Sequence, residues 1–233
     1  MITLRPASSR AHIVRPFIDT RRTFSFPPYF DARYRNYGNL QTINDDRVQH
    51  AWQVPWHEHK NMEIFGYVVS GSSHHVDSLG NDAEVPAGAV QRMSAGRGIS
   101  HTEGNTSHVP NRYLQLWIRP NQQEVEPHWS WHQFSTQEKL DRFCDITARL
   151  PIHADARFLA GIFTQRHTQI LDGARSHYVY VVRGQGQINQ DDYEEGTGLA
   201  LWQETELEIT PSTESEILWF ELEPHNGQNP VNS

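Results

Sequence analysis

The chain has 233 residues, 28 acidic and 20 basic side chains, a formal net charge of −8 and a single cysteine. The acidic balance, without a run of basic residues, argues against direct nucleic-acid binding, and no apolar stretch approaches the roughly 18 residues of a membrane-spanning helix. The start, MITLRPASSR, lacks the apolar core of a secretory signal, and a lone cysteine cannot form an internal disulfide; we therefore expect a cytoplasmic protein without a membrane partner.

Short runs of β-branched and aromatic residues follow one another along the chain, separated by clusters of Gly, Pro, Asn and Asp. Such runs predict β-strands joined by turns. Many short strands at close spacing are typical of a sandwich or barrel rather than of alternating strands and helices. The strands that we expect are Thr23–Phe26, Leu40–Ile43, Glu63–Val69, His74–Asp77, Val90–Ser94, Tyr113–Ile118, Arg157–Phe163, Tyr178–Val182, Gly186–Asn189, Gly198–Trp202, Glu206–Thr210 and Ile217–Leu222.

One segment has the pattern of a short helix. Ser135 and Glu138 have the spacing of a capping box, and Leu140, Phe143 and Cys144 follow at the i, i+3, i+4 spacing of a helix face. We therefore expect a short helix here, with Cys144 as a small buried side chain rather than a redox group.

The chain divides into two similar halves. The polar segment Pro120–Pro127 has the composition of a linker, and Glu63–Gly71 resembles Ser176–Gly184, since each is an apolar run that ends in a glycine turn. We expect two copies of one β unit, an N-terminal domain of residues 1–125 and a C-terminal domain of residues 126–233.

The 14 histidines are the unusual feature of the composition. His57 and His59 are two residues apart, so in a strand both imidazoles face one side while Glu58 faces the other. His101 and Glu103 have the same spacing. Pairs of this kind also arise by chance, and two surface histidines are the simpler interpretation of His57 and His59 alone. If the two runs converge, three imidazoles and one carboxylate form a site that suits Fe(II), Mn, Ni, Cu or Zn.

The segment from His57 to Trp117 resembles the pirin family of bicupins. The matching motifs are His57-x-His59, Met62-Glu63-Ile64, Gly71, His75-x-Asp77-Ser78-x-Gly80, Pro86-Ala87-Gly88, Ser94–Glu103 and Leu114–Trp117, with Arg22–Phe26 and Ile43–Asp46 similar to the family's N-terminal signature. The stronger resemblance covers residues 20–118, and the second half is similar to the family's C-terminal cupin.

This resemblance implies an all-β fold of two double-stranded β-helix barrels packed face to face, with short helical segments. It also implies one metal ion, in the N-terminal barrel, held by His57, His59, His101 and Glu103, with Fe(II) as the first expectation. The C-terminal barrel is expected to lack a metal site, because His153, His167, His177 and His225 include no His-x-His pair. Glu58 departs from the family, in which many members have proline at this position.

Large side chains beside these runs are candidates for a flat aromatic pocket. Trp52, Trp56, Met93 and Trp117 are near the ligand runs in sequence, although ordinary core packing explains them equally well. His74 and His75 are expected at the surface or behind the ligands.

The resemblance leaves two functions open. Some pirin-like bicupins cleave flavonols such as quercetin with O₂ and release CO; the substrate's 3-hydroxyl and 4-keto oxygens would chelate the ion. Glu103 would either stay bound to the ion or swing off to take the 3-hydroxyl proton as the catalytic base. Others are non-enzymatic, metal-dependent redox sensors that bind protein partners. An open aromatic cavity favours the dioxygenase, and a closed site beside a flat charged surface favours the sensor.

Overall fold

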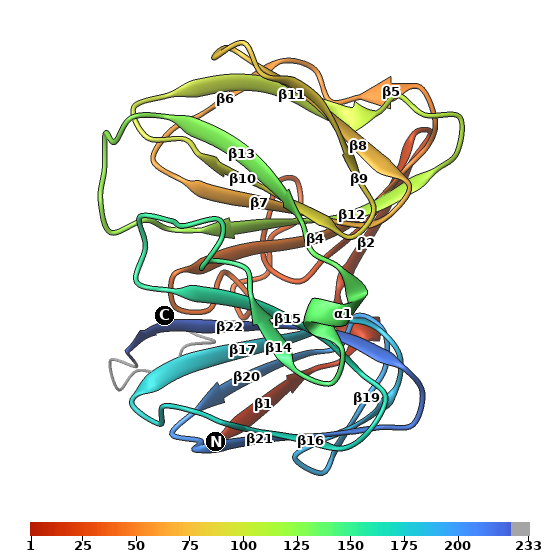
Figure 1. The fold of residues 1–233 in the computed structure, drawn as a ribbon, viewed down its shortest axis with the longest axis vertical. Coiled ribbons are helices and arrows are strands. Elements are labelled where there is room, and N and C mark those ends of the chain that lie inside the picture. Colours follow the sequence, from red (N-terminus) through yellow and green to blue (C-terminus); the bar gives the residue numbers. More distant parts are fainter. Residues whose placement is uncertain (225–233) are drawn as a thin grey trace.

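The computed structural model describes residues 1–224; residues 225–233, including His225, lie outside the described part. Its regular structure is almost entirely β-strand, arranged as two barrels, one above the other in Figure 1. Each barrel consists of a larger and a smaller antiparallel sheet, and the two larger sheets face each other. The predicted all-β fold of two face-to-face barrels is therefore confirmed.

The N-terminal barrel combines a seven-stranded and a five-stranded sheet. The larger sheet contains, in spatial order, β13 (His128–Gln133), β10 (Ala89–Ser94), β7 (Glu63–Ser70), β12 (Asn111–Ile118), β4 (Leu40–Val48), β3 (Ile18–Arg22) and β2 (Ala11–Arg15). The smaller contains β5 (Trp52–Gln53), β11 (Ile99–Asn105), β8 (Ser72–Asp77) and β9 (Asp82–Pro86), with β6 (His57–His59) also paired to β11.

The C-terminal barrel combines a six-stranded and a four-stranded sheet. The larger contains, in spatial order, β1 (Ile2–Arg5), β20 (Gly198–Trp202), β17 (Arg175–Arg183), β22 (Ser215–Pro224), β15 (Arg157–Phe163) and β14 (Phe143–Asp145). The smaller contains β16 (His167–Ile170), β21 (Glu206–Pro211), β18 (Gly186–Ile188) and β19 (Asp191–Tyr193).

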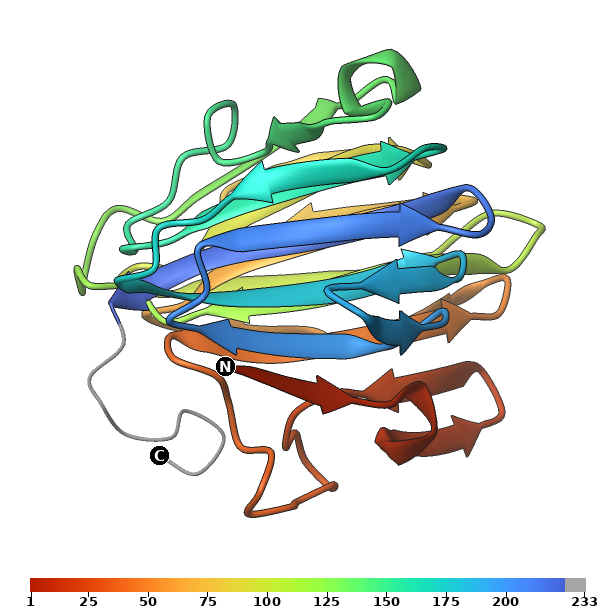
Figure 2. The ribbon, with the colours of Figure 1, turned by 90° about the horizontal axis from the view of Figure 1, so that it is seen from below.

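The barrels exchange strands near both ends of the N-terminal half. Strand β1 pairs with β20 and lies at the edge of the C-terminal sheet, where Figure 2 shows it in red beside blue β20. Strand β13, beyond residue 125, pairs with β10 of the N-terminal barrel. The domain boundary at residue 125 stays a prediction. Strand β1, before this boundary, belongs to the C-terminal sheet, and β13, after it, belongs to the N-terminal sheet.

One local expectation was wrong, and the expected short helix is confirmed. Residues Thr23–Phe26 form a bend rather than a strand: regular pairing ends at Arg22, and the following Pro27 and Pro28 have no N–H for a ladder. The helix is one turn, α1 (Thr136–Lys139), with the predicted capping box at Ser135.

The helix ends at Lys139 because Leu140 already has an extended backbone, and Asp141 follows with a positive φ of 52°. The chain then enters β14, so Phe143 and Cys144 are strand residues paired with β15. Cys144 is partly buried against the main core, as expected of a small apolar side chain.

A shared core holds the two barrels together. Side chains alternate along each strand, so one set points between the barrels and the other into the barrel interior. Phe65 and Phe158 meet across the interface at a ring-centroid distance of 5.2 Å, and Phe24 meets Tyr178 at 5.3 Å. At 25 cal/mol per Å², large buried aromatic side chains of this kind each contribute about 2 kcal/mol or more.

A buried ionic group also joins the barrels. Arg112 of β12 donates two hydrogen bonds of 2.8 Å to the fully buried carboxylate of Asp45 on β4. Tyr180 of β17 donates to the same carboxylate at 3.1 Å, and Arg112 donates to the Val182 carbonyl at 2.9 Å. Asp45 and Arg112 belong to the N-terminal barrel, whereas Tyr180 and Val182 belong to the C-terminal barrel. Because these hydrogen bonds cross between the barrels, the group fixes the position of one barrel relative to the other.

The barrel interiors differ in one respect that matters for function. The C-terminal interior is filled by one continuous apolar cluster: Leu159, Phe163, Leu171, Val179, Val181, Ile188, Tyr193, Leu199, Leu201, Leu207, Ile209, Ile217 and Trp219. The N-terminal interior has two smaller clusters, around Val68 and around Met93, with polar side chains between them. The cavity described below opens into this N-terminal barrel.

Candidate metal centre

Strand pairing places three histidines side by side. Strands β6 and β11 are antiparallel in a register that sets His101 opposite His57 and Ile99 opposite His59. Because residues two apart share a face, His57, His59 and His101 all face the same side, while Glu58, paired with Ser100, faces away. The predicted runs therefore converge.

The three imidazoles form a compact triad. Their ring centroids are 4.5 to 5.0 Å apart, and one nitrogen from each lies within 4.8 Å of the others. Nδ1 of His57 lies 2.9 Å from the Pro55 carbonyl oxygen, which assigns the proton to Nδ1 and leaves Nε2 as a lone-pair donor. Nε2 of His59 and Nε2 of His101 are buried without a hydrogen-bond partner. Buried unpaired nitrogens are costly, so this donor set fits a metal ion.

The imidazoles are in the protonation state that metal binding requires. Burial first, and then the neighbouring imidazoles, lower the pKa of His59 to about 4 and that of His101 to about 3. Both rings are therefore neutral at pH 7, with lone pairs available for coordination.

A hydrogen-bond chain lies behind His101. Its Nδ1 is 3.4 Å from Nδ1 of His75, whose Nε2 is 3.0 Å from Oδ2 of Asp77. Burial raises the pKa of Asp77, but hydrogen bonds from His75 and Asn81 outweigh it and hold that pKa below the usual value. An ionised Asp77 accepts from His75 Nε2–H, which leaves His75 Nδ1 to accept from His101 Nδ1–H and directs His101 Nε2 toward the triad.

Of the paired histidines on β8, only His75 belongs to this chain. His75 is buried and stacks on Trp129 at a centroid distance of 4.4 Å. His74 points to the other face, where it contacts Asp82 at 2.8 Å and Gln53 at 2.8 Å. Of the two positions expected, His74 thus lies near the surface and His75 lies behind His101.

Glu103 lies beside His101 and is held by two amides. Gln115 donates to its Oε1 at 2.7 Å and Gln91 donates to its Oε2 at 3.2 Å. Its carboxylate lies within 4.8 Å of donor atoms of His75 and His101, but it does not fall in one such group with His57 and His59. The structure thus brings together His57, His59 and His101, three of the four residues predicted as ligands. Glu103 lies next to His101 but not within the same distance of His57 and His59.

Gly66 makes room for one of these amides. A Cβ added to Gly66 would lie 2.7 Å from Nε2 and 2.9 Å from Cγ of Gln91. Glycine at this position therefore lets Gln91 lie flat against β7 and reach Glu103.

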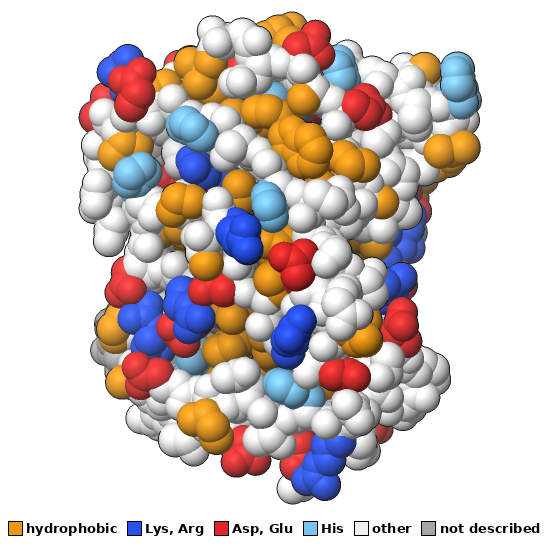
Figure 3. All heavy atoms as spheres, in the orientation of Figure 1, with side chains coloured by type: hydrophobic (Ala, Val, Ile, Leu, Met, Phe, Trp, Pro, Cys, Tyr) orange, Lys and Arg blue, Asp and Glu red, His pale blue; other side chains and the backbone are white. Residues whose placement is uncertain are grey.

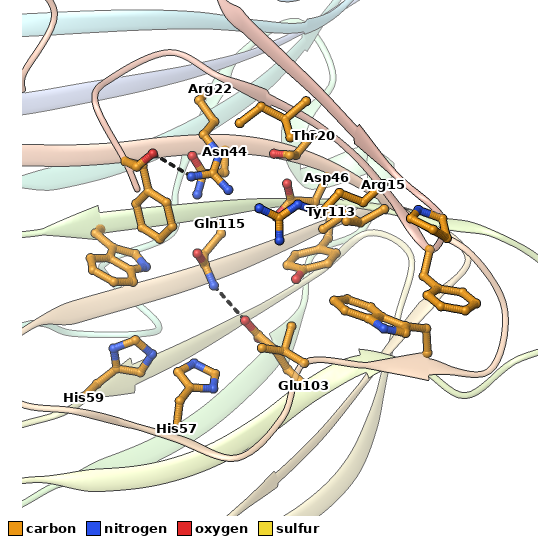
Figure 4. A pocket seen from close by; sticks show the side chains of 18 residues that line it. Arg15, Thr20, Arg22, Asn44, Asp46, His57, His59, Glu103, Tyr113 and Gln115 are labelled. Atoms are coloured by element: carbon orange, nitrogen blue, oxygen red, sulfur yellow. Dashed lines mark hydrogen bonds between the residues drawn. The ribbon is translucent and has the colours of Figure 1, made fainter. Parts of the chain in front are cut away.

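His57 and His59 of the triad, with Glu103, border an open cavity of about 530 Å³, large enough for a small aromatic molecule (Figure 4). Trp52 and Trp117, two of the four candidates for an aromatic wall, line it. Trp56 instead has an exposed fraction of 56%, and Met93 is buried among Ile64, Ala95 and Ile99.

Sequence reasoning missed the polar side of this cavity. The side chains that it did not assign to a pocket are Arg15, Arg22, Asn44, Asp46, Tyr113 and Gln115, although Arg22, Asn44, Asp46 and Gln115 lie within the segments that resemble the family. Strand alternation was the available signal for three of them. Tyr113 and Gln115 lie on β12, which was expected, and Asn44 lies on β4, one residue beyond the predicted end at Ile43. Figure 4 shows Gln115 and Glu103 joined by a hydrogen bond at the wall of the cavity.

The C-terminal barrel has no comparable group among residues 1–224. Both clusters of potential ligands in that range lie in the N-terminal barrel. His177 is fully buried, with Nε2 2.9 Å from the Asp172 carbonyl oxygen and Nδ1 accepting from Trp219 at 3.3 Å. It is a core histidine whose two nitrogens are both paired.

Two family models match the chain: Pirin over residues 4–118, and the quercetinase C-terminal cupin domain over residues 145–222. A quercetin 2,3-dioxygenase of Escherichia coli K12 is 34% identical over 230 residues, which are 96% of this chain and 100% of the relative. The chain belongs to the pirin family. A pirin-like protein of Caulobacter vibrioides is 30% identical, with 94% of this chain and 98% of the relative covered.

A solved pirin has the same fold. The structure of the E. coli pirin YhhW in complex with nickel(II) superimposes with a TM-score of 0.90 at 32% identity, covering 97% of this chain and 100% of that one. This chain is accordingly a pirin-type cupin protein with a candidate site for a divalent metal. No helix within residues 1–224 has the length and apolar character needed to span a membrane.

Proposed function

We propose that this pirin is a metal-dependent dioxygenase that cleaves a flavonol of the quercetin type with O₂ and releases CO. The observation that carries the proposal is the triad of His57, His59 and His101, with two unpaired buried Nε2 atoms, of which His57 and His59 line an open aromatic cavity. Relatives that are 34% identical over nearly the whole chain are named quercetin 2,3-dioxygenase, which supports the same reaction.

The ion would be held by His57, His59 and His101, with Glu103 as the fourth ligand. A bound divalent metal supplies Lewis-acid chemistry toward the 3-hydroxyl and 4-keto oxygens of a flavonol. Fe(II) is the first ion to test, because a mixed set of imidazoles and one carboxylate suits it, and Ni(II) is the second, given the nickel complex of the E. coli pirin.

Glu103 would act as the base of the reaction. Its carboxylate accepts the 3-hydroxyl proton, and the resulting flavonolate is electron-rich enough to react with O₂. The amides of Gln115 and Gln91 hold the carboxylate in place through their hydrogen bonds to Oε1 and Oε2. Trp117 and Trp52 form apolar walls that orient a planar ring system and exclude water.

The alternative, a non-enzymatic metal-dependent sensor that binds protein partners, would use the same four residues. The open cavity favours the enzyme over the sensor. On the face shown in Figure 3, acidic and basic side chains are interspersed rather than gathered by sign. The predicted cytoplasmic location stays a prediction.

Oxygen consumption with quercetin tests the proposal. We expect turnover by Fe(II)- or Ni(II)-loaded protein, loss of metal and turnover in His57→Ala, and loss of turnover with retained metal in Glu103→Gln. His167→Ala, on the other barrel, is the matched control and should behave as wild type. A fully loaded protein that consumes no oxygen with quercetin would refute the proposal.

A further inference from the structure

Two arginines lie in the cavity on the side opposite the histidines. Arg15 ends β2 and Arg22 ends β3, and both side chains line the cavity that His57 and His59 border. In Figure 4 the arginines lie on one side and the histidines on the other, with Gln115 and Glu103 between them. The cavity thus has a metal-binding side and a cationic side.

The charge of these arginines is not matched by a carboxylate. Within residues 1–224, neither Arg15 nor Arg22 forms an ion pair, whereas most other arginines near the barrel interface do. Arg22 donates to the backbone carbonyls of Phe26 and Pro27, and its Nε is buried without a partner. A half-buried guanidinium without a counterion is unfavourable, so this side of the cavity favours an anion.

The acid that faces Arg22 only partly offsets this charge. Asp46 lies in the same cavity, and burial raises its pKa to about 7, so it is only partly ionised at neutral pH. Burial lowers the pKa of Arg22, Asp46 raises it, and the charge of Arg15 lowers it. Asp46 also makes no ion pair with either arginine.

The turn that follows Arg15 forms part of the mouth. Phe17, at the tip of the β2–β3 hairpin, has an exposed fraction of 51% and lies parallel to Trp52 at a centroid distance of 6.4 Å and an interplanar angle of 10°. Phe26 and Trp117 meet edge to face at 5.1 Å elsewhere in the lining. A flat ring system between these walls would reach from the histidines to the arginines.

We propose that Arg15 and Arg22 receive a carboxylate, so that the substrate is a planar aromatic acid whose oxygen donors face the histidines and whose carboxylate faces the arginines. This inference rests on the proposed function in one respect, namely that the substrate's oxygen donors bind a metal ion held by the histidines. The cationic side selects the substrate, because a guanidinium binds a carboxylate through two parallel hydrogen bonds and a neutral flavonol offers no such group.

The test compares binding of 3-hydroxyflavone and 4′-carboxy-3-hydroxyflavone to the metal-loaded protein by calorimetry under argon, where no turnover occurs. We expect wild type to bind the carboxylate about tenfold more tightly, in line with one charge-assisted hydrogen-bonded pair. Arg15→Gln should abolish this preference and Arg15→Lys should restore part of it. Arg166→Gln is the matched control, since it removes one arginine from an exposed ion pair on the other barrel.

Arg15 is exposed and makes no hydrogen bond in the described chain, so its replacement leaves the fold intact; circular dichroism verifies this. A salt titration of wild type gives a second measurement, because screening should reduce the preference as ionic strength rises. Equal binding of the two probes by wild type, or a preference that survives Arg15→Gln, would overturn the inference.

The two proposals fail in different ways. Arg15-dependent preference in binding, without turnover of either probe in air, supports the inference and removes the proposed reaction. Turnover of both probes without any preference supports the reaction and overturns the inference.

Discussion

Replacing His75 with phenylalanine tests the hydrogen-bond chain behind His101. The imidazole of His75 connects Asp77 to His101 through contacts of 3.0 and 3.4 Å. Phenylalanine keeps a planar aromatic ring that can stack on Trp129, while both hydrogen bonds are lost. His101 Nδ1–H then has no acceptor, and the ring loses the contact that orients Nε2 toward His57 and His59.

The expected cost is a loss of metal affinity. Removing an outer hydrogen-bond partner of a histidine ligand weakens metal binding by about 10- to 100-fold, or about 1.4 to 2.7 kcal/mol. The contact between the two Nδ1 atoms is long for a hydrogen bond, which places the expected loss nearer tenfold. Asp77 keeps its hydrogen bonds from Asn81 and from the backbone of Leu79, so the turn after β8 remains folded.

Competition of the protein with a coloured chelator for Ni(II) measures this loss. His74→Phe is the matched control, because it makes the same replacement one residue away, on the face that contacts Gln53 and Asp82. We expect wild-type affinity in His74→Phe and about tenfold weaker binding in His75→Phe. Equal affinity of His75→Phe and wild type, with both proteins folded, would refute the orienting role of His75.

Three further predictions concern the interface and the cavity. Asp45→Ala should lower the free energy of unfolding by about 3 to 5 kcal/mol, because Arg112 is left buried without its partner, whereas Glu124→Ala, at an exposed ion pair, should cost under about 1 kcal/mol; urea unfolding measures both. Burial raises the folded-state pKa of Asp46 to about 7, so its contribution is lost as pH rises from the unfolded value near 4 through 7; Asp46→Asn should therefore remove a fall in stability across this range, and an unchanged pH profile of thermal unfolding would contradict it. Gly66→Ala should displace the flexible Gln91 from Glu103 and lower kcat more than it raises KM, with stability reduced by only about 1 kcal/mol; wild-type kinetics would show that the Gln91 amide is dispensable.

Local patterns in the sequence predicted most of the strands and the placement of His57 and His59 on one strand face. The two-residue spacing of His57 and His59 needs only strand geometry to place both rings on one face. Recognising that His101 joins them needed the family resemblance, because the register of β6 against β11 depends on residues 40 to 44 positions apart. The pairing of β11 with its other neighbour, β8, places His75 opposite Glu103, and no local signal predicts this register either.

The features that sequence patterns did not predict depend on long-range pairing. Strand β1 crosses to the C-terminal sheet because its partner is β20, about 200 residues away. Arg15 and Arg22 enter the cavity because the β2–β3 hairpin adds to the edge of the sheet at β4. The short helix ends at Lys139, because Leu140 is already extended, and a capping box indicates where a helix starts but not how long it is.

Release of CO from quercetin tests the central claim most directly. The account predicts one CO for each quercetin consumed by the metal-loaded protein in air, none from His57→Ala, and none under argon. Consumption of quercetin without CO, or CO release that persists in His57→Ala at the wild-type rate, would contradict a flavonol dioxygenase built on this triad.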